Sequence, residues 1–265
     1  MEPLVFLHNP KAGGTAVADL LRSAFGPGQV APLRETSPHE RDPAGWANLR
    51  QCRFVAGHFG YEVVEHHFPG HGTITNFRHP VSRVASLYDY WRSVAVSPTL
   101  PNPNGPAYAS RLSFSEFIRD PSPFLGLYLE DFHTRQLVAS GWLPATLGEP
   151  ELERARGRIR ALRWFYVCER EQDSLAWLAA VYPRLAAGRP LARVNVTTAL
   201  HRTVPTAADT EVIASRNRHD LAVYEFAADL LRGRVAAGRG PRAAVRLTAQ
   251  ASVRMKNELT SREPS

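Results

Sequence analysis

The chain has 265 residues, of which 44% are hydrophobic and 22% are charged, an ordinary composition for a globular protein. No uncharged stretch reaches the roughly 18–20 residues that a membrane-spanning helix needs, so we expect no membrane span. The chain enters an apolar run at Leu4 without a basic start or a cleavage-like site. We therefore expect a cytoplasmic protein without a secretion signal.

The formal charge of +7 is unevenly distributed. From Arg232 onward there are eight basic and two acidic residues, whereas the preceding body has 24 basic and 23 acidic residues. We predict one domain over residues 1–232 and a basic, flexible tail over residues 233–265. Such a tail is able to bind an anionic partner, although a solvated terminus has the same composition. The near-neutral body weighs against a highly anionic polysaccharide as the substrate, and we expect no nucleic-acid partner.

Cysteine and lysine are both rare. The two cysteines, Cys52 and Cys168, can form a single disulfide at most, and we predict two buried free thiols. The two lysines are Lys11 and Lys256, so Lys11 is alone in a body that otherwise uses arginine. A single lysine beside two glycines suggests a position that requires a compact ammonium group.

The first segment predicts a strand, a tight turn and a helix. Residues Leu4–His8 form an apolar run typical of a buried parallel strand. The turn covers residues 9–15. Apolar residues then recur at helical spacing until Phe25-Gly26-Pro27, which ends the helix. Residues 27–50 indicate a connecting loop or a short helix.

Two further strands are predicted at Arg53–Ala56 and Thr73–Phe77. Pro80 suits the first position of a helix, and apolar residues follow it at helical spacing through Trp91. Residues 97–110 are rich in proline, so we predict no regular structure there. This segment is either a substrate lid or an insertion without function.

The last part of the body predicts a strand at Arg163–Cys168, a helix ended by Pro183, a short strand at Val194–Thr198 and a helix over roughly Ala208–Leu231. Strands that alternate with helices favour an α/β fold. We expect a single domain with a mostly parallel central sheet flanked by helices and a P-loop-like phosphate-binding strand–loop–helix.

The turn after the first strand has the features of an anion site. Gly13 and Gly14 let the backbone approach a ligand closely, and the helix N-terminus favours a phosphate. Lys11 and Thr15 add donors. The segment lacks the Walker pattern, because Lys11 precedes the glycines and Asn9 stands where that pattern has its first glycine. A plain tight turn is the alternative interpretation.

A second phosphate-binding motif follows the third strand. Arg78 ends that strand, and Ser86 lies about two turns into the next helix. An arginine and a helix hydroxyl are able to hold a second, separate phosphate. The alternative is a helix on which Arg78, Arg83 and Ser86 are merely exposed.

Together the two motifs resemble those of sulfotransferases that use 3'-phosphoadenosine 5'-phosphosulfate (PAPS). Residues 6–15 (FLHNPKAGGT) resemble the 5'-phosphosulfate loop, and residues 78–88 (RHPVSRVASLY) resemble the 3'-phosphate motif R-x-P-x-x-R-x-x-S-x-Y. The likeness is strongest to carbohydrate sulfotransferases of the heparan sulfate 2-O type. It continues weakly through Gly57-His58, the strand before Cys168 and residues 194–198 and 203–206. Residues 92–160 match no motif and are interpreted as a variable acceptor-side insertion.

The resemblance implies roles for individual residues. Lys11 would contact the oxygen that bridges the 5'-phosphate and the sulfuryl group, and Arg78 and Ser86 would hold the 3'-phosphate. The 5'-phosphate would lie on the backbone of Ala12, Gly13, Gly14, Thr15 and Ala16. A looser match assigns Asn195, Thr197 and Thr198 to the nucleotide, because relatives often have a basic residue where Asn195 stands.

The reaction requires a base that accepts the proton of the acceptor hydroxyl. His58 lies where the resembling enzymes have their catalytic histidine, and its ordinary pKa of ~6.5 leaves it largely neutral near pH 7. Glu62 is the reserve candidate, and a structural histidine is the alternative. The resemblance implies no metal. Five histidines lie between residues 58 and 79, and Glu62 and His66 among these residues have i,i+4 spacing. A polar helix and loop explains this cluster better than a metal site.

Three functions therefore remain open. The first is a PAPS-dependent sulfotransferase that acts on a hydroxyl of a glycan, a lipid or a secondary metabolite. The second is a P-loop-type ATP-dependent kinase, which requires an acidic Mg²⁺ ligand at a strand end. The third is a non-catalytic module that binds an anionic polymer through the basic tail. Tyr88, Tyr90 and Trp91 either line the acceptor pocket or belong to the core.

Overall fold

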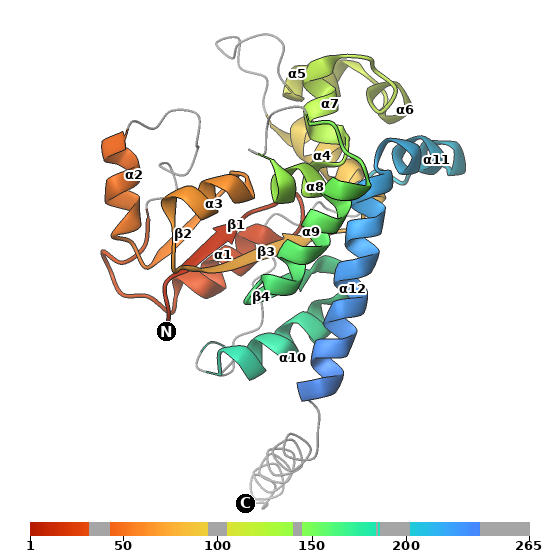
Figure 1. Ribbon diagram of the computed structural model, residues 1–265. Coiled ribbons are helices and arrows are strands. Elements are labelled where there is room, and N and C mark those ends of the chain that lie inside the picture. The colour runs from red at the N-terminus through yellow and green to blue at the C-terminus, as the bar shows by residue number, and fades with distance from the viewer. Residues whose placement is uncertain (32–42, 95–104, 140–144, 184, 186–201, 239–265) are drawn as a thin grey trace, which may run out of the picture.

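The computed structural model describes residues 1–31, 43–94, 105–139, 145–183, 185 and 202–238 (Figure 1). Within these ranges the chain is an α/β protein with a central parallel sheet flanked by helices. None of the helices in these ranges is both long enough and apolar enough to cross a membrane. The predicted strand at residues 194–198 and the tail after residue 238 lie outside the described residues.

In the part of the chain that the structure describes, the sheet has four strands in the order β2-β1-β3-β4, and all neighbouring strands are parallel. Their residues are buried, as expected for strands that read as continuous apolar runs. The four predicted strands that fall within the described residues are confirmed, with ends that differ by one residue. The four strands are Leu4–Leu7 (β1), Phe54–Gly57 (β2), Gly72–Phe77 (β3) and Trp164–Val167 (β4).

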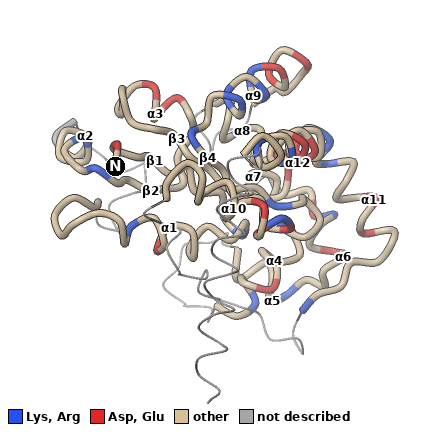
Figure 2. The backbone as a smooth tube through the Cα atoms, turned by 90° about the horizontal axis from the view of Figure 1, so that it is seen from below, with Lys and Arg blue, Asp and Glu red and all other residues tan. Residues whose placement is uncertain are grey.

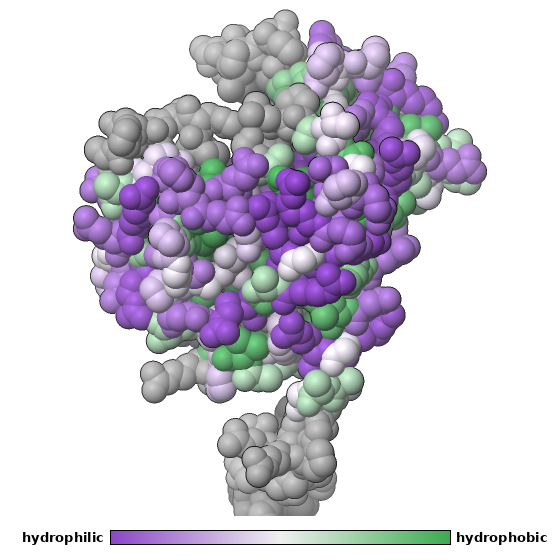
Figure 3. Space-filling view, in the orientation of Figure 1, coloured by the Kyte–Doolittle hydropathy of each residue, from purple (hydrophilic) through white to green (hydrophobic). Residues whose placement is uncertain are grey.

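Helices cover both faces of the sheet. Helix α1 (Gly14–Arg22) lies on one face, and α3 (Tyr61–His67), α8 (Phe132–Val138) and α9 (Glu149–Ala161) lie on the other (Figure 1). Side chains of β1 alternate accordingly. Leu4 and Phe6 join the core that contains α1, whereas Val5 and Leu7 pack with α3 and with α2 (Pro43–Arg50). Hydrophilic side chains cover most of the outer surface over α3, α8 and α9 (Figure 3).

A second apolar cluster surrounds α4 (Pro80–Ser93), which follows β3 as predicted. It joins α4 to α5 (Gly105–Arg111), α6 (Phe114–Phe117) and α7 (Pro123–Leu129). Helix α5 corrects the prediction that residues 97–110 are irregular, of which residues 97–104 lie outside the described ranges. Pro106 is tolerated because it is the second residue of α5, where the helix needs no backbone N–H donor. Gly105 then packs against the indole of Trp91.

The final elements differ from the prediction in one respect. After β4, a short 3₁₀ helix (Cys168–Arg170) leads into α10 (Glu171–Val181). The single helix predicted over Ala208–Leu231 is two helices, α11 (Ala207–Arg216) and α12 (Arg218–Gly238), with Asn217 between them. Helix α12 runs past residue 232, the predicted end of the domain, to Gly238. It packs against α8, α9 and α10.

Helices α8 and α12 cap each other. The carboxylate of Asp131, the residue before α8, accepts hydrogen bonds from the backbone N–H groups of His219 and Asp220 in α12. In return, the carboxylate of Asp220 accepts from the backbone N–H groups of His133 and Thr134 in α8. Asp131 has a φ of 40°, a left-handed conformation that is unfavourable for a residue other than glycine. The exchange of caps between the two helices compensates for this strain.

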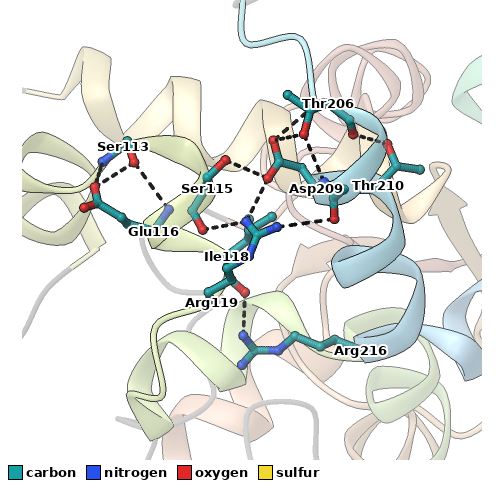
Figure 4. A network of polar contacts seen from close by, with 10 residues as sticks. Ser113, Ser115, Glu116, Ile118, Arg119, Thr206, Asp209, Thr210 and Arg216 are labelled. Carbon is teal, nitrogen blue, oxygen red and sulfur yellow. Dashed lines mark hydrogen bonds and ion pairs between the residues drawn. The ribbon is translucent and has the colours of Figure 1, made fainter.

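Helices α6 and α11 are joined by a network around a buried carboxylate (Figure 4). Asp209 of α11 accepts hydrogen bonds from the Ser115 hydroxyl at 2.7 Å, the Arg119 guanidinium at 2.8 Å and the Thr206 hydroxyl at 2.8 Å. Its side chain is only 4% exposed. The Ser115 bond, followed by those from Arg119 and Thr206, lowers the pKa of Asp209 despite its burial.

We predict that Asp209→Asn lowers the free energy of unfolding by about 1–3 kcal/mol near neutral pH, because the donors around the site lose a charged partner. A lowered pKa in the folded state gives stability above the unfolded pKa of ~3.9 that is lost as the pH falls through the folded value. The difference between variant and wild type should therefore narrow below about pH 4. Urea unfolding at several pH values measures this.

The matched control is Asp229→Asn, which removes an exposed carboxylate paired with Arg232 on α12. This change should alter stability by less than about 0.5 kcal/mol. If Asp209→Asn has the same effect at every pH, the charge of Asp209 does not stabilise the fold.

Candidate functional site

The candidate site lies where the carboxyl ends of β1 and β3 meet. From β1 the chain continues to β2, which lies toward one edge of the sheet. From β3 it continues to β4, which lies toward the opposite edge. In open parallel sheets, such a change of direction leaves a crevice at the carboxyl ends of the strands, where ligands bind. Both predicted phosphate motifs begin at this point, since one follows β1 and the other follows β3.

A pair of buried amides ties the loop after β1 to the end of β3. The backbone N–H of Asn9 donates to Asn76 Oδ1 at 2.8 Å, and Asn76 Nδ2 donates to the carbonyl oxygens of Asn9 and Ala12, each at 2.9 Å. Asn9 Nδ2 donates to the carbonyl oxygen of Asn76 at 2.7 Å. Both asparagines are fully buried. These bonds fix the loop on both sides of Lys11.

The loop backbone is strained at Lys11. Its φ of 63° lies in the left-handed region, which costs a residue with a Cβ of order 1–3 kcal/mol. Gly13 has a φ of 74° and immediately precedes α1. Glycine would adopt this backbone conformation without strain, so the lysine stands at a position whose conformation favours glycine. An observed outlier of this kind points to a role for the side chain.

Packing also requires the two glycines. A Cβ on Gly13 would lie 2.9 Å from Cε1 of Tyr166, and a Cβ on Gly14 would lie 2.1 Å from Cδ2 of the His8 ring. We had expected these glycines to let a ligand approach the backbone. The structure adds a second reason, because the loop fits between two aromatic rings only without these side chains.

The N-terminus of α1 faces outward. Gly13 and Thr15 are exposed there, whereas Ala12 and Gly14 are buried and Ala16 is half-buried. Among the described residues, no side chain caps α1, and the first turn of the helix has no acidic residue. This helix end favours an anion through its dipole and its N–H groups.

Lys11 and Arg78 come together at the carboxyl ends of β1 and β3. Nη1 of Arg78 donates a hydrogen bond to the carbonyl oxygen of Lys11 at 2.9 Å. Nζ of Lys11 lies 4.0 Å from the centre of the Tyr90 ring in the last turns of α4. Burial, followed by the nearby Arg78 charge, lowers the pKa of Lys11 to about 8, and Asp89 acts in the opposite direction. Two cationic groups from separate motifs thus share one site.

The residues of the second motif differ in burial. Ser86 is half-buried on α4 and shares a helix face with Asp89 and Tyr90, which are three and four residues later. Arg78 is also half-buried. Arg83 is fully buried and donates to the carbonyl oxygen of Tyr128 at 2.8 Å. The interpretation of Arg83 as an exposed residue is therefore wrong, because it links α4 to α7 inside the protein.

His58 lies beside the same loop, at the end of β2. Its Nδ1 is 2.7 Å from the carbonyl oxygen of His8, and the two imidazole rings are 4.5 Å apart. Burial lowers the pKa of His58 and lowers that of His8 to about 3, where the nearby His58 and Lys11 charges contribute further. Both rings are therefore neutral near pH 7.

Sequence reasoning missed three residues of the site. His8 was included in the strand and in the loop motif but was given no role, and Asn76 appeared only as part of a strand. Gln136 lies in the segment without recognised motifs, yet α8 brings its Nε2 to 3.4 Å from the carbonyl oxygen of His8. A polar side chain in an apolar strand was an available signal for Asn76. No comparable signal marked Gln136.

Other predicted residues are not brought to the loop or are not described. Glu62 is exposed in the first turn of α3. Asn195, Thr197 and Thr198 lie outside the described residues. The segment that follows them is anchored near the site, because Thr203 donates its hydroxyl to Asp89 at 2.6 Å.

The remaining histidines and the cysteines have structural surroundings. His67 stacks on Trp46 with ring centres 4.2 Å apart, and His79 meets Tyr224 edge to face. Within the described ranges, no group of three or more His, Cys, Asp and Glu side chains is placed to hold a metal ion. Cys52 and Cys168 do not form a disulfide, as predicted, but they are half-buried rather than buried.

A comparison of the chain with protein-family models found no match, and a comparison with curated proteins found none either.

We predict that Gly14→Ala lowers the free energy of unfolding by about 1–3 kcal/mol, because the new Cβ displaces the His8 ring. The same change in a His8→Ala background should cost less, since the obstructing ring is absent. Denaturant unfolding of the four proteins of this double-mutant cycle measures the difference.

Gly157→Ala in α9 is the matched control, because nothing lies within 4 Å of its added Cβ. It should stabilise the protein by up to about 1 kcal/mol through helix propensity. An equal effect of Gly14→Ala with and without the His8 ring would show that this contact does not determine the glycine.

Proposed function

We propose that the protein is a sulfotransferase that transfers the sulfuryl group of PAPS to a hydroxyl of a carbohydrate, lipid or small-molecule acceptor. The observation that carries this proposal is the hydrogen bond from Arg78 to the carbonyl oxygen of Lys11. It joins two motifs separated by 67 positions, one proposed for each phosphate of the donor. A plain tight turn does not explain why both converge on one crevice.

In the proposed reaction, the bond between sulfur and the bridging oxygen of the 5'-phosphate breaks as the acceptor oxygen bonds to sulfur. The products are the sulfated acceptor and 3',5'-adenosine bisphosphate. Lys11 neutralises the charge that develops on the bridging oxygen. The uncapped N-terminus of α1 holds the 5'-phosphate in a P-loop-like manner, and Arg78 and Ser86 hold the 3'-phosphate.

His58 accepts the proton of the acceptor hydroxyl in this proposal. A neutral imidazole that donates from Nδ1 to the carbonyl oxygen of His8 has its basic lone pair on Nε2. Its lowered pKa keeps it in the basic form over a wider pH range. General-base assistance of this kind is typically worth about 10²–10⁴ in rate. Glu62 is a weaker candidate because it is exposed on α3.

An ATP-dependent kinase is the second candidate, and one observation keeps it under test. Glu169 is the second residue after β4, close to the strand end where a Mg²⁺ ligand would be required. However, its Oε1 accepts a hydrogen bond from the backbone N–H of His79 at 3.1 Å.

The binding module that uses the basic tail ranks third. In the body, acidic and basic residues are interspersed along α9 and α12 (Figure 2). We propose a cytoplasmic location for the enzyme.

The test of the donor is thermal unfolding with 3',5'-adenosine bisphosphate, 5'-AMP or ATP–Mg²⁺. A ligand at about 100 times its dissociation constant adds ~2.7 kcal/mol, which corresponds to a shift of several degrees. We expect a clear shift with the bisphosphate and a much smaller one with 5'-AMP, which lacks the 3'-phosphate. A larger shift with ATP–Mg²⁺ would overturn the proposal in favour of the kinase.

Variants on one helix make this test specific. Ser86→Ala should reduce the shift with the bisphosphate, whereas Ser93→Ala should not. Ser93 is exposed on the same helix, and its hydroxyl donates only within the last turn. Equal shifts for both variants would remove Ser86 from the proposed site.

The pH dependence of kcat/KM for transfer from PAPS to water should be bell-shaped. Because the pKa of His58 is lowered, the rate should fall on the acid side only below the ordinary value of ~6.5. Because the Lys11 pKa is about 8 and its ammonium form is required, the rate should fall as the pH rises through that value. Lys11→Arg keeps the charge at all these pH values, so its residual activity should lose the alkaline limb. If the rate of Lys11→Arg still falls at alkaline pH, a group other than Lys11 causes that fall.

A further inference from the structure

Tyr90 is placed unlike the other aromatic residues of α4. Tyr88 and Trp91 are buried in the apolar cluster around α4, whereas the Tyr90 residue is 43% exposed. Its ring is nevertheless engaged, because Nζ of Lys11 lies 4.0 Å from the ring centre. A large apolar ring that contributes little to the core and covers a charged group requires an explanation.

The rest of Lys11 is already fixed. The Asn76 side chain binds the carbonyl oxygens of Asn9 and Ala12, on either side of Lys11. Arg78 binds the carbonyl oxygen of Lys11 itself, and the backbone holds a φ of 63°. The remaining freedom is that of the long side chain, which has several rotatable bonds. The Tyr90 ring restricts that freedom at its charged end.

We infer that Tyr90 is a positioning residue that holds the Lys11 ammonium at the mouth of the loop. The inference rests on the proposed function of Lys11. A cation over the face of an aromatic ring is attracted by the ring quadrupole. The ring shields one side of the ammonium from water, and the other side can face the oxygen from which the sulfuryl group departs. Tyr90 thus acts through Lys11 and does not itself react.

The contact can be tested without any activity. Reductive methylation with ¹³C-formaldehyde labels the two lysines, Lys11 and Lys256, in addition to the N-terminal amine. The methyl resonance of Lys11 should be shifted upfield by the ring current of Tyr90, and Lys256→Arg assigns the second lysine signal. Tyr90→Leu should abolish the shift, whereas Tyr90→Phe should retain it. A shift that persists in Tyr90→Leu would overturn the contact.

The consequence for catalysis is tested by transfer from PAPS to water, which needs no identified acceptor. Tyr90→Leu should lower kcat by about 3- to 30-fold, the range expected for a cation–π contact. Affinity for 3',5'-adenosine bisphosphate should change by less than about threefold on the same basis. Tyr90→Phe should restore kcat, because the ring and not the hydroxyl makes the contact.

Phe226→Leu is the matched control. Phe226 lies on α12, and its ring also lies beneath a cation, because Cζ of Arg160 is 4.8 Å from the ring centre. This variant should leave kcat unchanged. A wild-type kcat in Tyr90→Leu would overturn the positioning role, and so would an equal loss of kcat and bisphosphate affinity. Failure of the unmodified protein to bind the bisphosphate would instead contradict the proposed function, while the resonance shift would still report the contact between Tyr90 and Lys11.

Discussion

The reciprocal hydrogen bonds between Asn9 and Asn76 hold the candidate site together. Both amides are fully buried, where an unpaired polar group is costly, so these bonds strongly favour one arrangement of the loop. That arrangement places Lys11 in a left-handed conformation and directs its carbonyl oxygen toward Arg78. The start of α1, the approach of Tyr90 and the meeting of the two motifs all depend on it.

The site is built outward from this contact in layers. Ring packing against His8 and Tyr166 determines that glycines follow Lys11. His8 in turn presents its carbonyl oxygen to His58, and α8 adds Gln136 to the same oxygen. Proposed binding roles and structural roles therefore fall within the same few residues. A variant at one of these positions needs a structural control before its effect on activity is interpreted.

Much of the central fold could be predicted from the sequence because buried parallel strands are continuous apolar runs. The strands at residues 4–7 and 164–167 are of this kind. Lys11 could be identified as a candidate site residue from composition and motif, since a lone lysine next to two glycines is unusual. The bounds of the later helices were harder to predict. Pro106 suggested a loop until its position at the start of α5 was known. No proline or glycine within residues 208–231 marks the break at Asn217.

Contacts between distant segments were not predictable from local patterns. Nothing near Tyr90 in the sequence indicates that its ring leaves the core and covers Lys11, because its neighbours Tyr88 and Trp91 are buried. Likewise, no sequence motif predicts which residues Gln136 and Asn76 contact. Such pairs are set by the topology of the sheet and by the helices that pack on it, which single-sequence periodicity does not determine.

The exchange of caps between α8 and α12 has a consequence for the order of events during synthesis. Asp131 and Asp220 are separated by 89 positions, and each stabilises the first turn of the other's helix. Residues 132–138 therefore leave the ribosome with their first backbone N–H groups exposed to water. They gain their proper partner only when residue 220 emerges. A chain that stops before this point would retain an incomplete α8, and with it an incompletely supported Gln136 beside the loop.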